Sequence, residues 1–295
     1  NPPLFPKNTS LICINGSPEE LEQNRSADKI LLSDPYAFLE ALMDFGKSRT
    51  SKERDEWYSL QKILRQEWVE SSLSDLEQEE PDDLMMHPLR LALEVQSLMN
   101  QNDWLVIDGG NTHFWSEIAV NMAGAQGKEL AGILHPGSFS MLGVGVSFGL
   151  AAKLNHPKDR VVVISGDGAF LSGGLSIEAA FQENVPITVV IDNNGGLTTI
   201  SQQQERLFAD ERHIATDFRD IPFHTMFEGM GGHGELVEKP EDLQLALERA
   251  LSSGKTACVN VRTRSAISPI VLATTSKRDK ASIESLNQLI RIKWL

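Results

Sequence analysis

Two short apolar runs, each followed immediately by polar residues, limit most strongly what this chain can fold into. Residues 160–165 (RVVVIS) lead into Gly166, Asp167 and Gly168, and residues 187–191 (ITVVI) lead into the polar sequence 192–194 (DNN). Both runs are rich in β-branched residues and lack polar alternation, which is typical of strands buried in a parallel sheet. Residues 169–184 are predicted to form a helix that ends before a proline. This strand–helix–strand unit places the polar residues at the carboxyl edge of the sheet, where ligands bind.

The residues at this edge have the chemistry of a metal and phosphate site. Gly168 permits a sharp turn, and the free N–H groups of Gly168 and Ala169 begin a helix whose N-terminus can bind an anion. The carboxylate of Asp167 would repel that anion unless a cation lay between them. Asn194 adds an amide oxygen from the neighbouring strand end, and hard oxygen ligands of this kind suit Mg²⁺. The pattern therefore predicts a clamp in which Mg²⁺ joins the protein to a diphosphate.

The sequence GDG, followed by a helix and then NN, resembles the diphosphate-binding signature of thiamine-diphosphate enzymes. Two upstream segments, 108–115 (DGGNTHFW) and 135–145 (HPGSFSMLGVG), resemble cofactor loops of the group that contains acetolactate synthase, benzaldehyde lyase and 2-hydroxyacyl-CoA lyase. The resemblance is strong over residues 88–262 and weak over residues 11–44. It implies an α/β fold with an open parallel sheet flanked by helices, preceded by a partial Rossmann-like central domain.

The resemblance implies cofactor-binding residues in all of these segments, and it implies that Mg²⁺ is held by Asp167, Asn194 and Gly196. The side chains of Asn111 and Thr112 are expected to donate to phosphate oxygens. The implied cofactor-binding residues are Gly110, Asn111, Thr112, Ser140, Leu142, Gly166, Asp167, Gly168, Ala169, Asn194, Gly196 and Leu197.

Residues 138–153 are rich in glycine, alanine and serine and are predicted to form a helix. Glycine weakens a free helix by about 1 kcal/mol relative to alanine, so a helix of this composition is expected to pack very close to another backbone or to the cofactor. The resemblance implies that Leu142 props the cofactor in a bent conformation; ordinary core packing is the alternative role for this residue.

Four segments are expected along the chain: a C-terminal part of a central domain (1–46), a linker with one helix (47–86), the diphosphate-binding domain (87–264) and a C-terminal tail (265–295). The acidic run 74–83 (SDLEQEEPDD) is expected to be a solvated linker, although a partner-binding segment is the alternative. In the family, tails of this kind cover the active site or bind a CoA nucleotide; a solvated terminus is the alternative here.

The net charge of −14 argues against nonspecific binding to nucleic acid or to an anionic membrane. No stretch of 18 or more apolar residues is present, so no membrane span is expected. Cys13 and Cys258 both lie in apolar runs and are expected to be buried thiols, which favours a reducing, cytoplasmic location. The first residues have no apolar signal-peptide core and no initiator methionine, so the chain is expected to be a piece of a longer product.

The resemblance implies a thiamine-diphosphate- and Mg²⁺-dependent lyase or carboligase that acts on 2-keto acids or 2-hydroxyacyl-CoA. Residues 136–139 and 195–196 favour the CoA lyase branch, and residues 197–199 depart from the acetolactate synthase pattern. In the family the activating glutamate lies on a pyrimidine-binding domain of another subunit, so a homodimer or homotetramer is expected, and no catalytic residue is assigned within this chain. The alternatives are a non-catalytic cofactor-binding or regulatory subunit and a Mg²⁺-dependent phosphotransfer enzyme, which the lack of a Walker lysine disfavours.

The histidines do not predict a zinc site. They show no paired i, i+4 arrangement with an acidic third ligand. Two of them, His113 and His135, lie in the expected cofactor loops, where they could contact the substrate or the cofactor. No G-x-S-x-G elbow is present, and residues 143–149 lack the spacing of a dinucleotide-binding loop.

Overall fold

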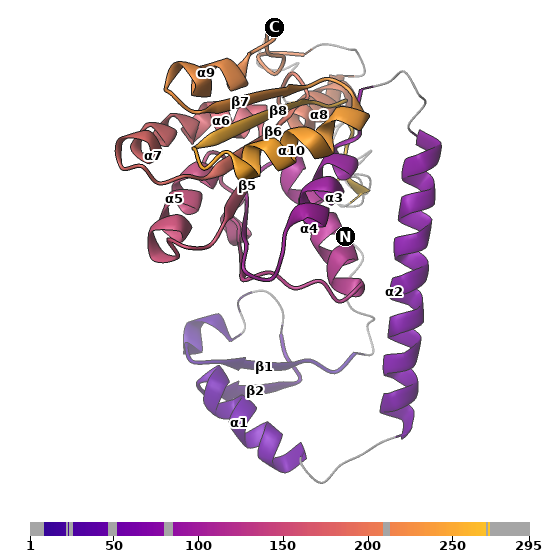
Figure 1. Cartoon of the computed structure of the whole chain (residues 1–295). Helices are drawn as coiled ribbons and strands as arrows, with labels where there is room; N and C mark the ends of the chain where they lie inside the picture. Colours follow the sequence, from indigo (N-terminus) through magenta and orange to yellow (C-terminus); the bar gives the residue numbers. More distant parts are fainter. Residues whose placement is uncertain are drawn as a thin grey trace, which may run out of the picture. The chain divides into compact units, whose positions relative to one another are not determined.

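The computed structural model describes residues 9–21, 23, 26–46, 52–79, 85–208, 213–269 and 271. The chain divides into two compact units, Asn1–Leu64 and Arg65–Leu295. Figure 1 labels the helices and strands of both units. Within the described residues, no helix combines the length and the apolar character needed to cross a membrane.

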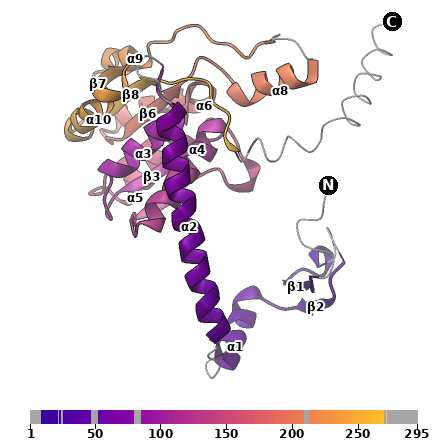
Figure 2. The same ribbon diagram turned by 90° about the vertical axis from the view of Figure 1, so that its right-hand side faces the viewer.

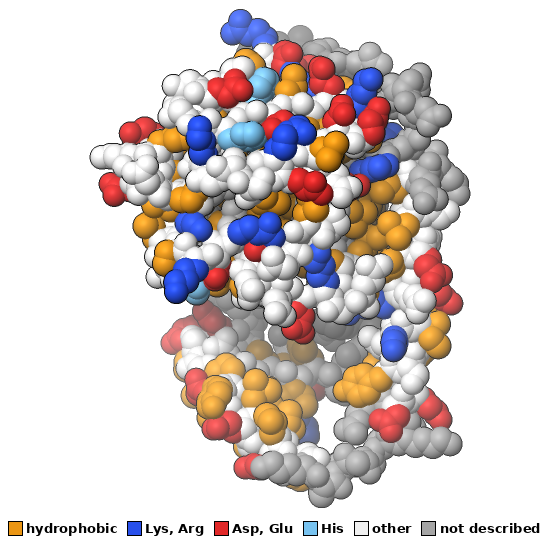
Figure 3. All heavy atoms as spheres, viewed as in Figure 1, with side chains coloured by type: hydrophobic (Ala, Val, Ile, Leu, Met, Phe, Trp, Pro, Cys, Tyr) orange, Lys and Arg blue, Asp and Glu red, His pale blue; other side chains and the backbone are white. Residues whose placement is uncertain are grey.

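The small unit contains a two-stranded parallel sheet and a helix. Strands β1 (Ile12–Asn15) and β2 (Lys29–Leu32) pair directly and in parallel. The short 3₁₀ helix η1 (Pro18–Glu20) lies between them in the sequence, and α1 (Pro35–Gly46) follows β2. Among its described hydrophobic residues only Leu21 is buried, and many large apolar side chains are exposed, as the orange atoms on this unit show (Figure 3). The unit therefore exposes apolar surface of the kind that an interface covers.

Helix α2 (Lys52–Glu79) is continuous and crosses the boundary between the two units. The acidic run was predicted to be a linker from Ser74 onward, but residues 74–79 are helical; residues 80–84 lie outside the described residues. The end of α2 is held because Val69 and Leu76 are buried in an apolar cluster with α3 and α4. Tertiary packing therefore extends the helix beyond the point at which composition alone suggested an end.

The large unit is built on a six-stranded, entirely parallel sheet with the strand order β4-β3-β5-β6-β8-β7. This confirms the predicted fold class, and both predicted buried strands belong to this sheet. The strands are β3 (Trp104–Ile107), β4 (Gly132–Leu134), β5 (Val161–Gly166), β6 (Thr188–Asn193), β7 (His233–Val237) and β8 (Ala257–Arg262).

Alternate residues of the strands pack into two apolar clusters, one on each face of the sheet. Val162 and Ile164 of β5 join α3 (Pro88–Leu98) and α10 (Leu243–Ser252) on one face. Val161 and Val163 join α5 (Gly145–Asn155), α6 (Asp167–Gly173) and α9 (Phe223–Gly229) on the other face. Cys258, in β8, is fully buried within the second cluster. The three layers are visible in two views (Figures 1 and 2).

The helix predicted over residues 169–184 is not continuous. It is divided into α6, the 3₁₀ helix η3 (Gly174–Ile177) and α7 (Glu178–Gln182). The division occurs at the paired glycines Gly173 and Gly174, where the chain passes directly against the backbone of Gly143. A close backbone contact, which only glycine permits, therefore interrupts the helix.

The helix predicted over residues 138–153 begins later than expected. Residues Gly137–Phe139 form the 3₁₀ helix η2, and α5 starts only at Gly145. Between them, Ser140 (φ 49°) and Gly143 (φ 86°) adopt left-handed conformations that end a right-handed helix. The expected close packing is nevertheless confirmed, because a Cβ atom on Gly149 would lie 2.7 Å from Cγ2 of Val163.

Candidate functional site

The strand order reverses beside β3, because the chain leaves β3 for the edge strand β4 and returns to β5 on the other side of β3. In open parallel sheets, ligands bind in the crevice at such a switch point. A cavity of about 300 Å³ lies there, bordered by the segments that follow β3, β5 and β6. All twelve predicted cofactor-binding residues line this cavity. The lining residues that were not predicted are Gly109, Phe114, Thr198, Thr199 and Ile200.

Asp167 is the first residue of α6, and its carboxylate joins the ends of β5 and β6. Its Oδ1 accepts a hydrogen bond from the N–H of Gly168 (2.6 Å), and its Oδ2 accepts from the N–H groups of Gly195 (2.8 Å) and Gly196 (3.0 Å). Two bonds occupy Oδ2, so Oδ1 is the oxygen with a lone pair available to a cation. The carboxylate therefore both fixes the loop after β6 and presents an oxygen at the cavity.

Burial, followed by the charge of nearby Asp192, raises the pKa of Asp167 to about 7, although its three backbone hydrogen bonds act in the opposite direction. Asp192 is fully buried, and burial raises its pKa as well. The hydroxyl of Thr112 donates to Oδ2 of Asp192 at 2.6 Å, and the hydroxyl of Thr263 donates to its other oxygen. Two buried carboxylates at adjacent strand ends concentrate negative charge, and a cation would relieve their repulsion.

The loop after β6 presents two further oxygen atoms. Oδ1 of Asn194 accepts a hydrogen bond from the hydroxyl of Thr198 (3.0 Å), and the carbonyl of Gly196 accepts from the N–H of the same residue (3.0 Å). Gly195 turns the chain with φ 80°, a value that favours glycine. The three predicted metal ligands, Asp167, Asn194 and Gly196, thus border one cavity.

Helix α4 (Asn111–Ala125) begins at the cavity, with Gly110 at its N-cap (φ 94°). The amide of Asn111 donates to the carbonyl of Ala266 (2.6 Å), and the hydroxyl proton of Thr112 is directed to Asp192. These contacts use side-chain donors that were expected to face phosphate. The helix therefore offers chiefly the backbone N–H groups of its first turn to an anion.

Asp108 holds the loop that carries Ser140 and Leu142. The carboxylate is buried; its Oδ1 accepts from the N–H groups of Gly109 (2.8 Å), Gly143 (2.9 Å) and Val144 (3.2 Å), and its Oδ2 accepts from the hydroxyl of Ser165 (2.9 Å). Leu142 lines the cavity and is 40% exposed. Its position is consistent with a role at the cavity wall, while its role as a prop for a bent cofactor stays a prediction.

The predicted site did not include Asp108, Asp192 or Thr263. Asp108 and Asp192 carried a usable signal, since each lies at the carboxyl end of a buried strand, next to residues that were assigned. Thr263 carried none, because only the tertiary structure brings it to Asp192.

Neither His113 nor His135, which lie in the segments that resemble cofactor loops, lines the cavity. They lie instead beside Glu117, and Nε2 of His113 is 3.0 Å from Oε1 of Glu117. The three side chains present ligand-type atoms within 4.8 Å of one another. The predicted absence of an i, i+4 pair of histidines with an acidic third ligand is not contradicted, because the i, i+4 pair here is His113 and Glu117, and His135 comes from another segment.

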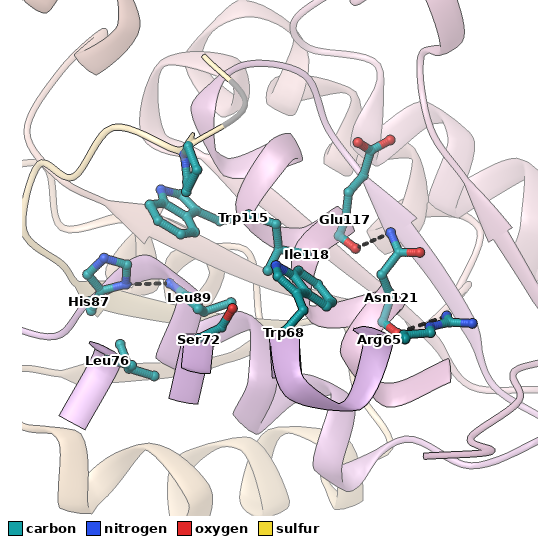
Figure 4. A pocket seen from close by; sticks show the side chains of 11 residues that line it. Arg65, Trp68, Ser72, Leu76, His87, Leu89, Trp115, Glu117, Ile118 and Asn121 are labelled. Carbon is teal, nitrogen blue, oxygen red and sulfur yellow. Dashed lines mark hydrogen bonds between the residues drawn. The ribbon is translucent and has the colours of Figure 1, made fainter. Parts of the chain in front are cut away.

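A second cavity, of about 470 Å³, lies among α2, α3 and α4 (Figure 4). Its walls are mostly apolar, with the two indoles of Trp68 and Trp115 among them. Two of its polar groups are engaged: Arg65 donates to the carbonyl of Asn121 (3.1 Å), and the indole N–H of Trp115 donates to the carbonyl of Ala266 (2.9 Å). Its lining residues do not bring together oxygen donors from two strand ends, as those of the first cavity do.

The cavity at the switch point thus has oxygen donors from two strand ends and the N-termini of two helices, which is the set that a divalent cation and a diphosphate require. The fold and the site define a parallel α/β domain that binds a phosphorylated cofactor. Residues 108–261 match the family "Thiamine pyrophosphate enzyme, C-terminal TPP binding domain", and the chain belongs to this family.

Several curated proteins are similar to this chain. A "Probable acetolactate synthase" of Mycobacterium bovis is 34% identical over 199 residues, which are 66% of this chain and 35% of that protein. "2-hydroxyacyl-CoA lyase 1" of Mus musculus is 26% identical over 271 residues, which are 88% of this chain and 45% of that protein. The chain therefore spans less than half the length of these relatives.

Proposed function

We propose that this chain binds thiamine diphosphate (thiamine pyrophosphate) through Mg²⁺ held by Oδ1 of Asp167, Oδ1 of Asn194 and the carbonyl of Gly196. The observation that carries the proposal is that Asp167 and Asn194, from neighbouring strand ends, border one cavity. Diphosphate oxygens and a water would complete the octahedral set that Mg²⁺ prefers. Without the cation, the buried charges of Asp167 and Asp192 would repel the diphosphate.

The remaining cavity residues position the cofactor. The first backbone N–H groups of α4 and α6 are directed by their helix starts at Gly110 and Gly166 toward the phosphate groups. Ser140 and Leu142, on the loop that Asp108 anchors, contact the rest of the cofactor. When bound, thiamine diphosphate supplies the electron sink for making and breaking bonds beside a carbonyl group, and the protein supplies orientation.

We propose further that the complete protein is a lyase or carboligase acting on 2-keto acids or 2-hydroxyacyl-CoA. Support comes from the names of its relatives, which are acetolactate synthases and 2-hydroxyacyl-CoA lyases. The sequence at positions 136–139 and 195–196 favours the CoA lyase branch over the acetolactate synthase branch.

This chain would supply one half of an active site. A pyrimidine-binding domain or subunit would contribute the activating glutamate, and a homodimer or homotetramer would bring the halves together. The small unit would be the end of a central domain, which accords with its exposed apolar residues, among them Leu32, Tyr36 and Met43. Two free thiols, Cys13 and Cys258, support a cytoplasmic location.

Calorimetric titration of the chain with thiamine diphosphate, with and without Mg²⁺, tests the cofactor proposal. Binding is expected only with the metal; metal-independent binding, or none, would count against it. A screen of the full-length product with 2-keto acids and 2-hydroxyacyl-CoA thioesters tests the reaction class. Cofactor binding without turnover of either class would favour the non-catalytic or regulatory subunit instead.

A further inference from the structure

We propose that His113, Glu117 and His135 form a second metal site, specific for zinc-like transition metals and separate from the Mg²⁺ clamp. One ligand atom from each residue lies within 4.8 Å of the other two. Among the residues that the structure describes, this is the only such triple of His, Cys, Asp or Glu side chains. Two imidazoles and a carboxylate are a ligand set that zinc commonly uses, with a fourth position left for water or another group.

The geometry of His113 and Glu117 already suits one shared ion. His113 and Glu117 lie one helical turn from each other on α4, and the distance between Nε2 of His113 and Oε1 of Glu117 is 3.0 Å. Two atoms that ligate one tetrahedral zinc at about 2.0–2.1 Å lie about 3.3 Å from each other. A small rotation of the partly exposed Glu117 side chain therefore suffices to open this pair around a metal.

The His113 ring is not satisfied by the protein around it. Only 6% of His113 is exposed, and its Nδ1 is buried with no hydrogen-bond partner among the described residues. A buried, unpaired ring nitrogen costs free energy and indicates a missing hydrogen-bond partner, such as a water, at Nδ1. Nε2, the nitrogen that faces the carboxylate of Glu117, is the atom that would ligate the metal.

His135 completes the set from another part of the chain. It is exposed, it follows β4, and its ring centre lies 5.4 Å from that of His113. Its Nδ1 accepts a long hydrogen bond from the N–H of Gly137 (3.2 Å); giving up this exposed contact costs little compared with a metal–nitrogen bond.

The carboxylate of Glu117 is available for this role. Figure 4 shows its side chain directed away from Arg65 and Asn121, the polar neighbours that border the larger cavity. Asn121 contacts only the backbone carbonyl of Glu117 (2.8 Å) in that view. Among the described residues, the hydrogen-bond partner of this carboxylate is the ring of His113.

A metal here would join two parts of the cofactor cavity wall. His113 and Glu117 belong to α4, whose first residues border the cavity, and His135 precedes the loop that carries Ser140 and Leu142. The ion would hold that loop against α4. Imidazole ligands select zinc-like ions over Mg²⁺, so the two sites would not compete for the same metal.

Titration of the tag-free, metal-stripped chain with Co²⁺ and Zn²⁺, followed by visible absorption and calorimetry, tests the proposal. About one equivalent of Zn²⁺ should bind and displace Co²⁺ from a tetrahedral spectrum, with Mg²⁺ in about tenfold excess having no effect. His135→Ala and Glu117→Gln, which change exposed or partly exposed side chains, should each weaken zinc binding by more than about 100-fold, the upper range for changes outside the first ligand shell.

His233→Ala is the matched control, because His233 also contacts a carboxylate, that of Glu235 (2.7 Å), but belongs to no such triple. Asp167→Ala should bind zinc normally although it loses Mg²⁺-dependent cofactor binding, which separates this site from the clamp. The Zn²⁺-bound chain should also melt at a higher temperature than the stripped chain, and His135→Ala should remove that difference. Unchanged zinc affinity in both ligand variants, or no binding at all, would overturn the proposal.

Discussion

The hydroxyl of Thr112 donates a hydrogen bond of 2.6 Å to the carboxylate of Asp192, joining the first turn of α4 to the end of β6 beneath the cavity. Thr263, after β8, donates to the same carboxylate. Asp192 is therefore held in place as a buried hydrogen-bond acceptor near Asp167. Its contacts with Thr112 and Thr263 join α4, β6 and the segment after β8, and its charge raises the pKa of Asp167.

The first prediction concerns pH. Because burial and Asp192 raise the pKa of Asp167 to about 7, this carboxyl is protonated in the metal-free chain below that pH and must lose its proton to bind Mg²⁺. Mg²⁺-dependent affinity for thiamine diphosphate should fall toward tenfold per pH unit below 7 and level off above it. Calorimetry between about pH 5.5 and 8.5 measures this.

Asp192→Asn should move the pH midpoint of cofactor affinity to lower pH, since it removes the neighbouring charge; an unmoved midpoint would contradict the electrostatic account.

The free energy of unfolding should depend on pH in the opposite direction to the cofactor affinity. A carboxyl whose pKa is raised on folding favours the folded state at low pH, so the metal-free chain should lose stability from Asp167 as the pH rises from about 4 to 7. Urea denaturation without Mg²⁺ measures this loss, and saturating Mg²⁺ with the cofactor should reverse it.

The second prediction separates the two side-chain metal ligands. Asp167→Ala should abolish measurable cofactor binding, because the diphosphate loses its metal bridge and the loop at Gly195 and Gly196 loses its acceptor. Asn194→Ala should weaken binding by only about tenfold, since a neutral ligand is replaced by water. Glu183→Ala removes an exposed carboxylate that does not border the cavity and should have no effect. Unchanged affinity in Asp167→Ala would remove the basis of the clamp.

The third prediction concerns the anchor of the loop that carries Ser140 and Leu142. Asp108→Ala leaves the N–H groups of Gly143 and Val144 and the hydroxyl of Ser165 without their acceptor. Bonds to a charged, buried acceptor are worth more than neutral ones, so the free energy of unfolding should fall by about 3 kcal/mol. Asp108→Asn, which keeps one acceptor oxygen, should lose less. Denaturation in urea measures both; equal stability of Asp108→Ala and the parent would show that the loop is held elsewhere.

The fourth prediction tests close packing at the cavity. A Cβ atom on Gly109 would lie 2.5 Å from the carbonyl oxygen of Met141 and 3.1 Å from Cδ2 of Leu142. Gly109→Ala should therefore displace residues 141–142, cost about 1–3 kcal/mol and weaken cofactor binding. Gly229→Ala is a matched control, since a Cβ there meets nothing within 4 Å. Similar melting temperatures for the two variants would contradict this steric explanation.

The sequence predicted the sheet and most of the cavity because both depend on short local patterns. The runs around Val163 and Val190 have no polar alternation, so they identify strands buried on both faces. The predicted ligands follow these strands directly, and a parallel sheet brings its carboxyl ends to one edge. Adjacency in sequence therefore placed Asp167 and Asn194 at one cavity without knowledge of tertiary contacts.

The missed features depend on tertiary contacts between distant residues. Helix 138–153 is shortened because Asp108 accepts the N–H groups of Gly143 and Val144, a contact that spans 35 residues. Strand β4 has only three residues and pairs at the edge with β3, so no pattern identified it. His135 reaches His113 only through the pairing of β4 with β3, whereas Glu117 was visible one helical turn away.

The burial of Cys258 in β8 has a practical consequence. Its thiol is fully enclosed and burial raises its pKa, whereas Cys13 in the small unit is partly exposed. A thiol reagent should therefore modify Cys13 in the native chain and reach Cys258 only when β8 separates from its neighbours. The two cysteines should therefore be modified at different rates. The rate at Cys13 would report solvent access in the small unit, and the rate at Cys258 would report how often the central sheet opens.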